Sequence, residues 1–212
     1  SSDLKRSTTP PMREAEAATG GTPARRARTP AIWIFLSLDC ASFGLFFIVF
    51  MAERMAQPAL FDASAQQLDA RLGFLNACIL ITSSWLVAWA ARVGLAGQIP
   101  QARRLLMAAL AVGAGFGVVK VLEYAQKIGA GLTIAANDFF MFYFALTGIH
   151  LVHYLVGMVV LAILAAGPSN TGPQAERDAR YRGWLVGGGL YWHMVDLLWI
   201  FIFSLLYLVG AR

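Results

Sequence analysis

The sequence predicts an all-α membrane protein that crosses the bilayer five times. Three observations support this fold class: 58% of the 212 residues are hydrophobic, only 14% are charged, and the apolar residues gather in five long runs. A water-soluble domain carries about 25% charged residues. The hydrocarbon core of a bilayer is about 30 Å thick and needs about 20 apolar residues per helix. Each of the five runs is long enough to cross it.

The five apolar runs define one transmembrane domain over residues 31–210. Helix is expected in every run, because an open sheet edge in lipid would leave backbone groups without partners. The fourth run is longer than a bilayer requires, so we expect tilt or extension beyond the lipid. The connection at 167–183 is rich in Gly, Pro and charge and is expected to be a plain hairpin. The runs cover residues 31–51, 72–91, 105–124, 139–166 and 184–209.

Basic residues gather on one side of the predicted bundle. Twelve lie before the first run and in or beside the second and fourth connections: Lys5, Arg6, Arg13, Arg25, Arg26, Arg28, Arg92, Arg103, Arg104, Arg177, Arg180 and Arg182. Four lie on the other side: Arg54, Arg71, Lys127 and Arg212. The positive-inside rule therefore places the N-terminus in the cytoplasm. Residues 1–30 lack apolar periodicity and are expected to form a disordered basic cytoplasmic tail. The positive charge thus reflects topology, and no nucleic-acid partner is expected.

Seven ionisable residues fall inside the apolar runs, where such groups are rare and need partners. They are Asp39, Lys120, Glu123, His150, His153, His193 and Asp196. Lys120 and Glu123 are three residues apart and Lys127 is four beyond Glu123, so the three share one helix face. We predict that they form an ion-paired ladder near the outer surface.

The remaining five residues are predicted to form an intramembrane polar layer. At a rise of 1.5 Å per residue, Asp39, His150, His153 and His193 all fall in the inner half of the membrane. Asp196 lies three residues beyond His193, on the same face. The layer would connect the first, fourth and fifth runs or face a partner subunit.

Metal or haem ligation is the alternative for the histidines. The chain has only three of them, fewer than a core with two haems and a copper requires. The sequence also has no nucleophile elbow, phosphate loop or zinc-protease motif. We therefore expect no catalytic residue, no metal site and no cofactor in this chain.

Glycines recur at helix-packing spacings in the third and fifth runs. Gly113 and Gly117 are four residues apart, as are Gly183 and Gly187. Small residues at this spacing allow close approach of two helices. We predict that these four glycines mediate packing within the chain or against a partner.

Two long motifs resemble the subunit III family of haem–copper oxidases. The first runs from Gly115-Phe-Gly-Val-Val-Lys120 through Thr147-Gly-Ile-His150-Leu-Val-His153 to Gly157, and the second is Tyr191-Trp-His193-Met-Val-Asp196-Leu-Leu-Trp199. They occur in the family's order and at its helix positions. Asp39 matches the family's membrane-embedded acid, which is usually Glu.

The resemblance implies a non-catalytic accessory subunit in the bacterial inner membrane. Its partners would be a large haem-binding catalytic subunit, which holds the haem and metal, and that subunit's electron-input subunit. Phospholipid would occupy a groove between the first two spans and the remaining three. The amino-acid residues of the two motifs most resemble those of the NorE-type accessory subunit of nitric oxide reductase. The alternatives are subunit III of a cytochrome c or quinol oxidase, a small transporter or channel, and an enzyme with its own haem.

Overall fold

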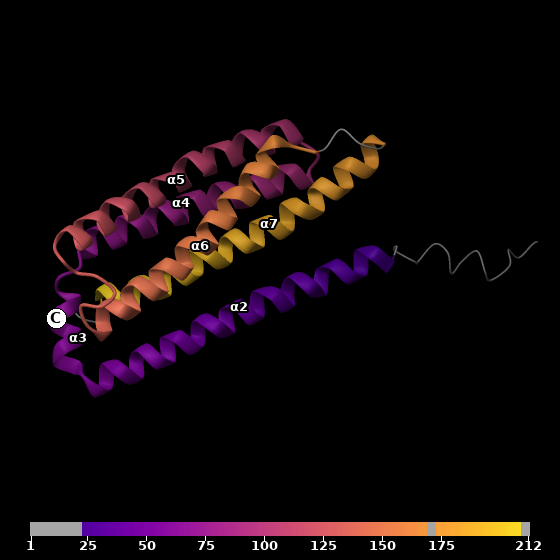
Figure 1. The fold of residues 1–212 in the computed structure, drawn as a ribbon. Helices are drawn as coiled ribbons and strands as arrows, with labels where there is room; N and C mark the ends of the chain where they lie inside the picture. Colours follow the sequence, from indigo (N-terminus) through magenta and orange to yellow (C-terminus); the bar gives the residue numbers. More distant parts are fainter. Residues whose placement is uncertain (1–22, 169–172, 209–212) are drawn as a thin grey trace, which may run out of the picture. The chain divides into compact units, whose positions relative to one another are not determined.

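The computed structural model describes residues 23–168 and 173–208, with side chains from Ile32 onward. The chain forms two compact units, residues 1–39 and 40–212. Within the first unit, the described part belongs to helix α2 (Pro23–Ala56), which continues into the second. The other helices, drawn in Figure 1, are α3 (Pro58–Ala65), α4 (Ala70–Leu95), α5 (Ile99–Gly129), α6 (Asp138–Ala166), α7 (Gln174–Phe203) and the π-helix η1 (Ser204–Leu208).

Five helical segments in the described part are long and apolar enough to cross a membrane, which confirms the predicted number of spans. They are Ile32–Ala56, Ala70–Leu95, Ile99–Gly129, Asp138–Ala166 and Gln174–Leu208. Each contains one predicted run or nearly all of it. The all-α prediction is also confirmed, because the described residues contain no strand.

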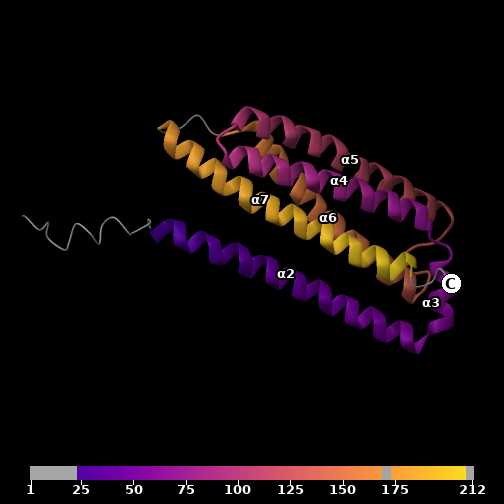
Figure 2. The same ribbon diagram turned by 180° about the vertical axis from the view of Figure 1, so that it is seen from behind.

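Helices α4, α5, α6 and α7 pack as a closed ring within the second unit. α4 packs against α5 and α7, and α6 packs against the same two helices. Figures 1 and 2 show the four helices side by side from opposite directions. The expected groove between the first two spans and the remaining three is therefore wrong, because the second span, α4, is fully part of the ring.

Close helix contacts explain several glycines. A Cβ atom on Gly113 would lie 3.2 Å from both Ser83 Oγ and a Trp192 ring carbon, and one on Gly117 would lie 3.0 Å from the Tyr154 hydroxyl. Both glycines thus lie at helix contacts, as predicted. A Cβ on Gly183 would meet no described atom within 4 Å, so Gly183 mediates no packing within the described part of the chain.

The close approaches of α7 occur at other positions. A Cβ on Gly188 would lie 2.7 Å from Leu164 Cδ1, and a Cβ on Gly157 of α6 would lie 2.7 Å from the Trp192 ring. Gly183 is therefore not one of the packing glycines of this helix in the described part of the chain. Gly187 is partly exposed, and its role in packing stays a prediction.

Two helices begin earlier than expected. α7 starts at Gln174, so residues 174–183 are helical, and the prediction of a plain hairpin over 167–183 is wrong for this part. Charged residues do not prevent a helix from continuing beyond the lipid, where water solvates them. α2 starts at Pro23, inside the segment 1–30 expected to be a disordered tail; residues 1–22 lie outside the described residues.

Aromatic rings join α2, α3 and α6 at one end of the second unit. The Phe50 ring lies 5.4 Å from that of Phe61 and 5.7 Å from that of Phe142, and Phe61 lies 5.7 Å from Phe139. All four are buried. Arg54 also donates to Asp62 Oδ1 at 2.5 Å. The short helix α3, which the sequence did not reveal, is held by these contacts.

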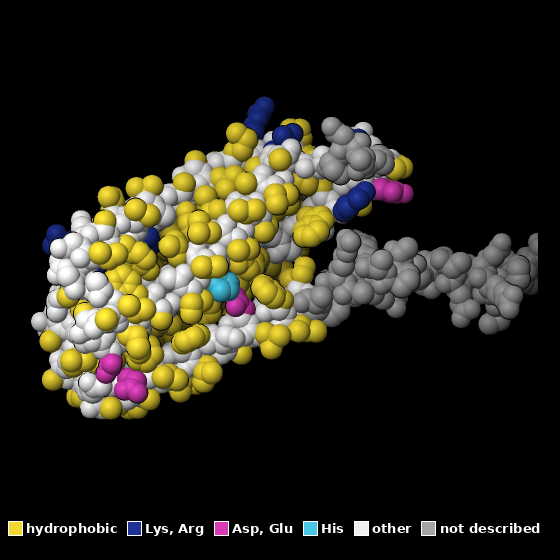
Figure 3. Space-filling model, viewed as in Figure 1, with side chains coloured by type: hydrophobic (Ala, Val, Ile, Leu, Met, Phe, Trp, Pro, Cys, Tyr) yellow, Lys and Arg dark blue, Asp and Glu magenta, His cyan; other side chains and the backbone are white. Residues whose placement is uncertain are grey.

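The surface of the bundle suits a lipid environment. Hydrophobic side chains cover most of the face shown in Figure 3, and most of the charged groups visible there lie toward the helix ends. Large apolar side chains are exposed along all four ring helices, among them Phe74, Trp85, Met107, Val121, Val152, Ile163, Trp184 and Phe201.

Candidate functional site

Lys120 and Glu123 are the most deeply buried charged residues in the described part of the bundle. Each side chain is only 1% exposed. Lys120 Nζ donates to Glu123 Oε2 at 2.9 Å and to the Tyr207 hydroxyl at 3.1 Å. The Tyr207 hydroxyl in turn donates to Glu123 Oε1 at 2.5 Å. Three side chains therefore form a closed hydrogen-bonded cluster.

Four aromatic rings surround the Lys120 ammonium, and we call the whole arrangement the lysine cage. The rings of Trp199, Tyr143, Tyr124 and Tyr207 have centroids 4.9, 5.1, 5.3 and 5.7 Å from Lys120 Nζ. Cation–π attraction to such rings partly replaces the hydration that a buried ammonium loses. The cage combines residues of α5, α6, α7 and η1, so it ties these elements together.

The predicted ion-paired ladder is thus confirmed for one pair. Lys120 and Glu123 do pair, and the pair is buried inside the bundle. Its place near the outer side of the membrane stays a prediction. Lys127 does not continue the ladder; its ammonium donates to the main-chain carbonyl of Gln67. Side chains of α6, α7 and η1 surround the Lys120 ammonium of this pair, which spacing on one helix cannot reveal.

The three histidines each have a separate hydrogen-bond partner. His150 Nε2 donates to the Val195 carbonyl of α7 at 3.1 Å, and His153 Nδ1 donates to the Ile149 carbonyl at 2.8 Å. His193 Nδ1 is hydrogen-bonded to the Ser84 hydroxyl of α4.

The ring contacts of the two α6 histidines also differ. His150 packs against Phe116 and Trp199, whereas His153 packs edge-on against Phe43. His150 therefore faces the interior of the ring of helices, and His153 faces the α2 portion of the second unit.

Asp196 is 94% buried, and neither carboxylate oxygen has a hydrogen-bond partner among the described residues. It lies on α7, one turn beyond His193. Asn76 of α4 is fully buried, and its amide also lacks a described partner. Asp39 belongs to the unit 1–39, and its membership of the polar layer stays a prediction.

Sequence reasoning missed most residues that complete these sites. Tyr143, Trp199 and Tyr207 resemble ordinary core aromatics in the sequence, and Ser84 resembles an ordinary small helix residue. Their roles depend on which helices are neighbours. Tyr207 also depends on the π-helical turn of η1, a form that often marks functional positions. Within the described residues, no three His, Cys, Asp or Glu side chains are grouped to hold a metal ion.

The profile of the family described as "Cytochrome c oxidase subunit III" matches residues 33–211. The chain belongs to the cytochrome c oxidase subunit III family. The match spans all five helical segments and both motifs.

Curated relatives of this subunit III chain come from several oxidases. "Cytochrome bo(3) ubiquinol oxidase subunit 3" of Pseudomonas aeruginosa is 26% identical over 179 residues, covering 84% of this chain and 83% of that protein. "Quinol oxidase subunit 3" of Bacillus subtilis is 25% identical over 180 residues, covering 84% and 85%. "Cytochrome c oxidase subunit 3" of the same organism is 25% identical over 179 residues, covering 84% of each chain.

A fourth relative is named as a combined subunit I and subunit III. "Heme-copper oxidase subunit I+III" of Aeropyrum pernix is 27% identical over 184 residues, covering 84% of this subunit III chain and 22% of that protein. The expectation of a multi-pass accessory subunit of an oxidoreductase complex, without catalysis of its own, is confirmed by these relatives and the family match.

Proposed function

We propose that this subunit III chain is the non-catalytic third subunit of an oxygen-reducing quinol or cytochrome c oxidase of a bacterial inner membrane. The observation that carries the proposal is the family match over residues 33–211, together with relatives that are named for quinol and cytochrome c oxidases and are covered over 83–85% of their length. These relatives favour an oxygen reductase over the nitric oxide reductase that the residues of the two motifs suggested.

The partner in this proposal is a large haem-binding catalytic subunit, which holds the haem and the metal, with its electron-input subunit. The fused subunit I+III of Aeropyrum pernix supports placement beside subunit I. The exposed apolar side chains of the ring helices supply surface for this partner and for phospholipid. The role we assign is mechanical: the cage-stabilised bundle supports the catalytic subunit.

Affinity purification of the tagged chain from membranes in mild detergent tests this function. Mass spectrometry and a reduced-minus-oxidised haem spectrum identify what is purified with it. We expect a large haem-binding subunit together with either a copper-binding subunit II or a quinol oxidase core. A tagged, unrelated five-span protein purified in parallel controls for membrane carry-over.

Two other results would contradict the proposal in different ways. A large subunit recovered with a membrane-anchored cytochrome c would indicate a nitric oxide reductase. Recovery of the chain alone, under conditions that keep respiratory complexes whole, would favour a small transporter, which transport assays in liposomes would then test.

A further inference from the structure

Three fully buried side chains inside the ring of helices carry polar atoms that no described residue satisfies. Asn76 of α4, His150 of α6 and Trp199 of α7 are each 0% exposed. Both amide atoms of Asn76, Nδ1 of His150 and Nε1 of Trp199 are buried without a hydrogen-bond partner among the described residues. Polar atoms buried in a folded protein nearly always have a partner, so these four atoms need one.

His150 and Trp199 lie side by side in the interior of the ring. Their ring centroids are 5.3 Å apart, and both rings pack against Phe116. The Nε2 atom of His150 donates to the Val195 carbonyl, so Nδ1 of the neutral ring is an acceptor. The indole N–H of Trp199 is a donor only. One buried acceptor and one buried donor therefore lie in the same region.

Asn76 reaches this region from α4. Two contacts fix the antiparallel alignment of α4 and α7: a Cβ atom on Gly73 would lie 2.7 Å from Phe203 Cδ2, and Ser84 is hydrogen-bonded to His193. Counting along both helices from either contact places Asn76 opposite residues 200–201, in the turn that begins at Trp199. Because Asn76 is fully buried, its amide points into the ring and adds a further donor and a further acceptor there.

The chemistry of these atoms identifies the ligand that satisfies them. Two are donors, Asn76 Nδ2 and Trp199 Nε1, and two are acceptors, Asn76 Oδ1 and His150 Nδ1. A cation would leave the N–H groups unpaired, and an anion would leave the two acceptors unpaired. Water both donates and accepts, and a buried water molecule makes about three hydrogen bonds to groups of this kind.

We propose that ordered water binds in the interior of the ring, held by Asn76, His150 and Trp199. The face of the Trp199 ring lies 4.9 Å from Lys120 Nζ, measured to the ring centroid, while its N–H donates to this water. The water therefore connects Asn76 of α4 to the lysine cage, which is built from α5, α6, α7 and η1. The site requires only the folded bundle, so it is independent of which oxidase holds the subunit.

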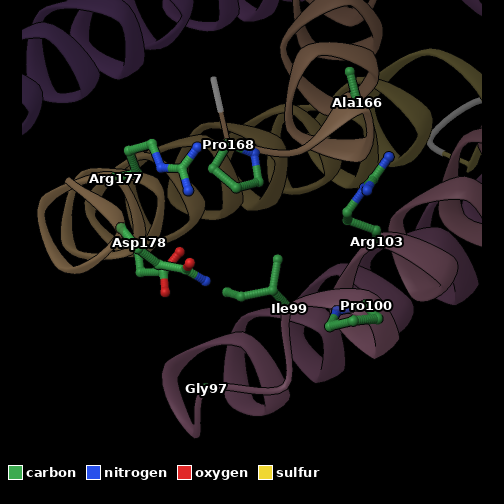
Figure 4. Close-up of a pocket in the computed structure, with 9 residues that line it drawn as sticks. Gly97, Ile99, Pro100, Arg103, Ala166, Pro168, Arg177 and Asp178 are labelled. Carbon is green, nitrogen blue, oxygen red and sulfur yellow. The ribbon is translucent and has the colours of Figure 1, made fainter. Parts of the chain in front are cut away.

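Arg177 provides a contrast at the end of the bundle. Its Nε is also buried without a described partner, but the side chain lines a pocket where the α4–α5 connection, the end of α6 and the start of α7 meet. Figure 4 shows Arg177 there with Asp178 beside it and Arg103 across the pocket. Gln174, which also lines this pocket, is exposed. Water from outside the bundle can therefore pair with Arg177, whereas the three interior groups need water that is bound inside the folded protein.

X-ray radiolysis of the chain, purified in mild detergent with the subunits that it retains, tests this site. The X-rays split bound water in place, and the hydroxyl radical oxidises the nearest side chain. After equilibration in water labelled with heavy oxygen, mass spectrometry locates the label. We expect Trp199 to be labelled severalfold faster than Phe61, each normalised to the unfolded chain. Phe61 is equally buried but packs among other phenylalanine rings.

Asn76→Leu replaces the amide by an apolar side chain of similar volume. It should lower the labelling of Trp199 severalfold and lower the midpoint of unfolding in detergent, because the water loses a donor and an acceptor. Thr82→Val is the matched control on the same helix. The Thr82 hydroxyl is exposed and donates to the Cys78 carbonyl of its own helix, so this variant should leave the labelling of Trp199 unchanged.

Radicals produced in bulk solvent from hydrogen peroxide distinguish bound water from solvent that enters through an opening of the bundle. They should leave Trp199 unlabelled. Fast labelling of Trp199 by these bulk radicals would contradict the proposal, because it would mean that outside solvent reaches the ring interior.

Three other results would overturn the proposal. Equal normalised labelling of Trp199 and Phe61 would mean that no water is bound beside Trp199, and this comparison needs no variant if Asn76→Leu does not fold. Unchanged labelling in Asn76→Leu would remove Asn76 from the site. A higher unfolding midpoint in Asn76→Leu would mean that the amide is dry, since removing an unsatisfied buried group stabilises a protein. None of these results depends on which subunits are purified with the chain, so this proposal and the proposed function fail separately.

Discussion

At the scale of single residues, the bundle contains two buried acids with opposite surroundings. Glu123 accepts from Lys120 and Tyr207, whereas Asp196 has no hydrogen-bond partner among the described residues. Breaking a buried ion pair by removing one partner costs about 3–5 kcal/mol, while a buried carboxylate without partners is itself unfavourable. Substitutions at the two positions should therefore have opposite effects on stability.

Glu123→Ala should destabilise the protein strongly, because it leaves the Lys120 ammonium buried without its counter-charge. We expect a loss of about 3–5 kcal/mol, measured by unfolding of the purified chain in detergent. The double variant Lys120→Met, Glu123→Leu should recover much of this loss, since an apolar pair of similar volume removes both charges. Equal instability of the single and double variants would show that the cage does not depend on the ion pair.

Asp196→Asn should leave stability unchanged or raise it. Asparagine has almost the same shape as aspartate and carries no charge to bury. The measurement is the same unfolding transition, with Glu123→Gln as the matched control, since that substitution removes a charge that does have partners. A clear loss of stability in Asp196→Asn would mean that the carboxylate has a favourable partner that the described contacts do not include.

At the scale of helices, packing between α6 and α7 depends on the absence of side chains at a few positions. Gly157 leaves space for the Trp192 ring, and Gly188 leaves space for Leu164. Interiors are packed too closely to absorb an added methyl group where the neighbour is a rigid ring. The helix contacts should therefore respond to substitution at these glycines but not at exposed ones.

Gly157→Ala should cost about 1–3 kcal/mol, the usual effect of overpacking, because its Cβ would lie 2.7 Å from the Trp192 ring. Gly183→Ala is the matched control on α7. It should be neutral or stabilising by up to about 1 kcal/mol, since alanine is the better helix former and no described atom is close. Unfolding in detergent compares them, and similar values for both would contradict the packing assignment.

At the scale of the whole molecule, the sequence predicted the number and order of the spans well, because a bilayer requires long apolar helices. It also placed Gly113 and Gly117 at helix contacts and paired Lys120 with Glu123. It did not predict that the pair is enclosed by Tyr143, Trp199 and Tyr207, since those contacts join residues as far as 87 positions apart. Periodicity reports one helix at a time and cannot identify its neighbours.

The predicted polar layer is tested best in the assembled complex. Asp39→Asn is expected to alter either assembly or the pH dependence of turnover in the parent oxidase, because it removes the one acid predicted for the layer on the first span. Asp69→Asn is the control: it lies outside the spans and caps α4, a role that asparagine fills equally well. If Asp39→Asn leaves both properties unchanged, the layer loses its main support.

The lysine cage also has a consequence for how the chain is made. Spans enter the membrane in sequence order, so α5 brings Lys120 and Glu123 into the lipid before Trp199 and Tyr207 have been synthesised. The two charges lie three residues apart on one helix, and they can neutralise each other within that single span during this interval. The aromatic side chains of α7 and η1 then close around a pair that already exists, which makes insertion of the last span the step that completes the bundle.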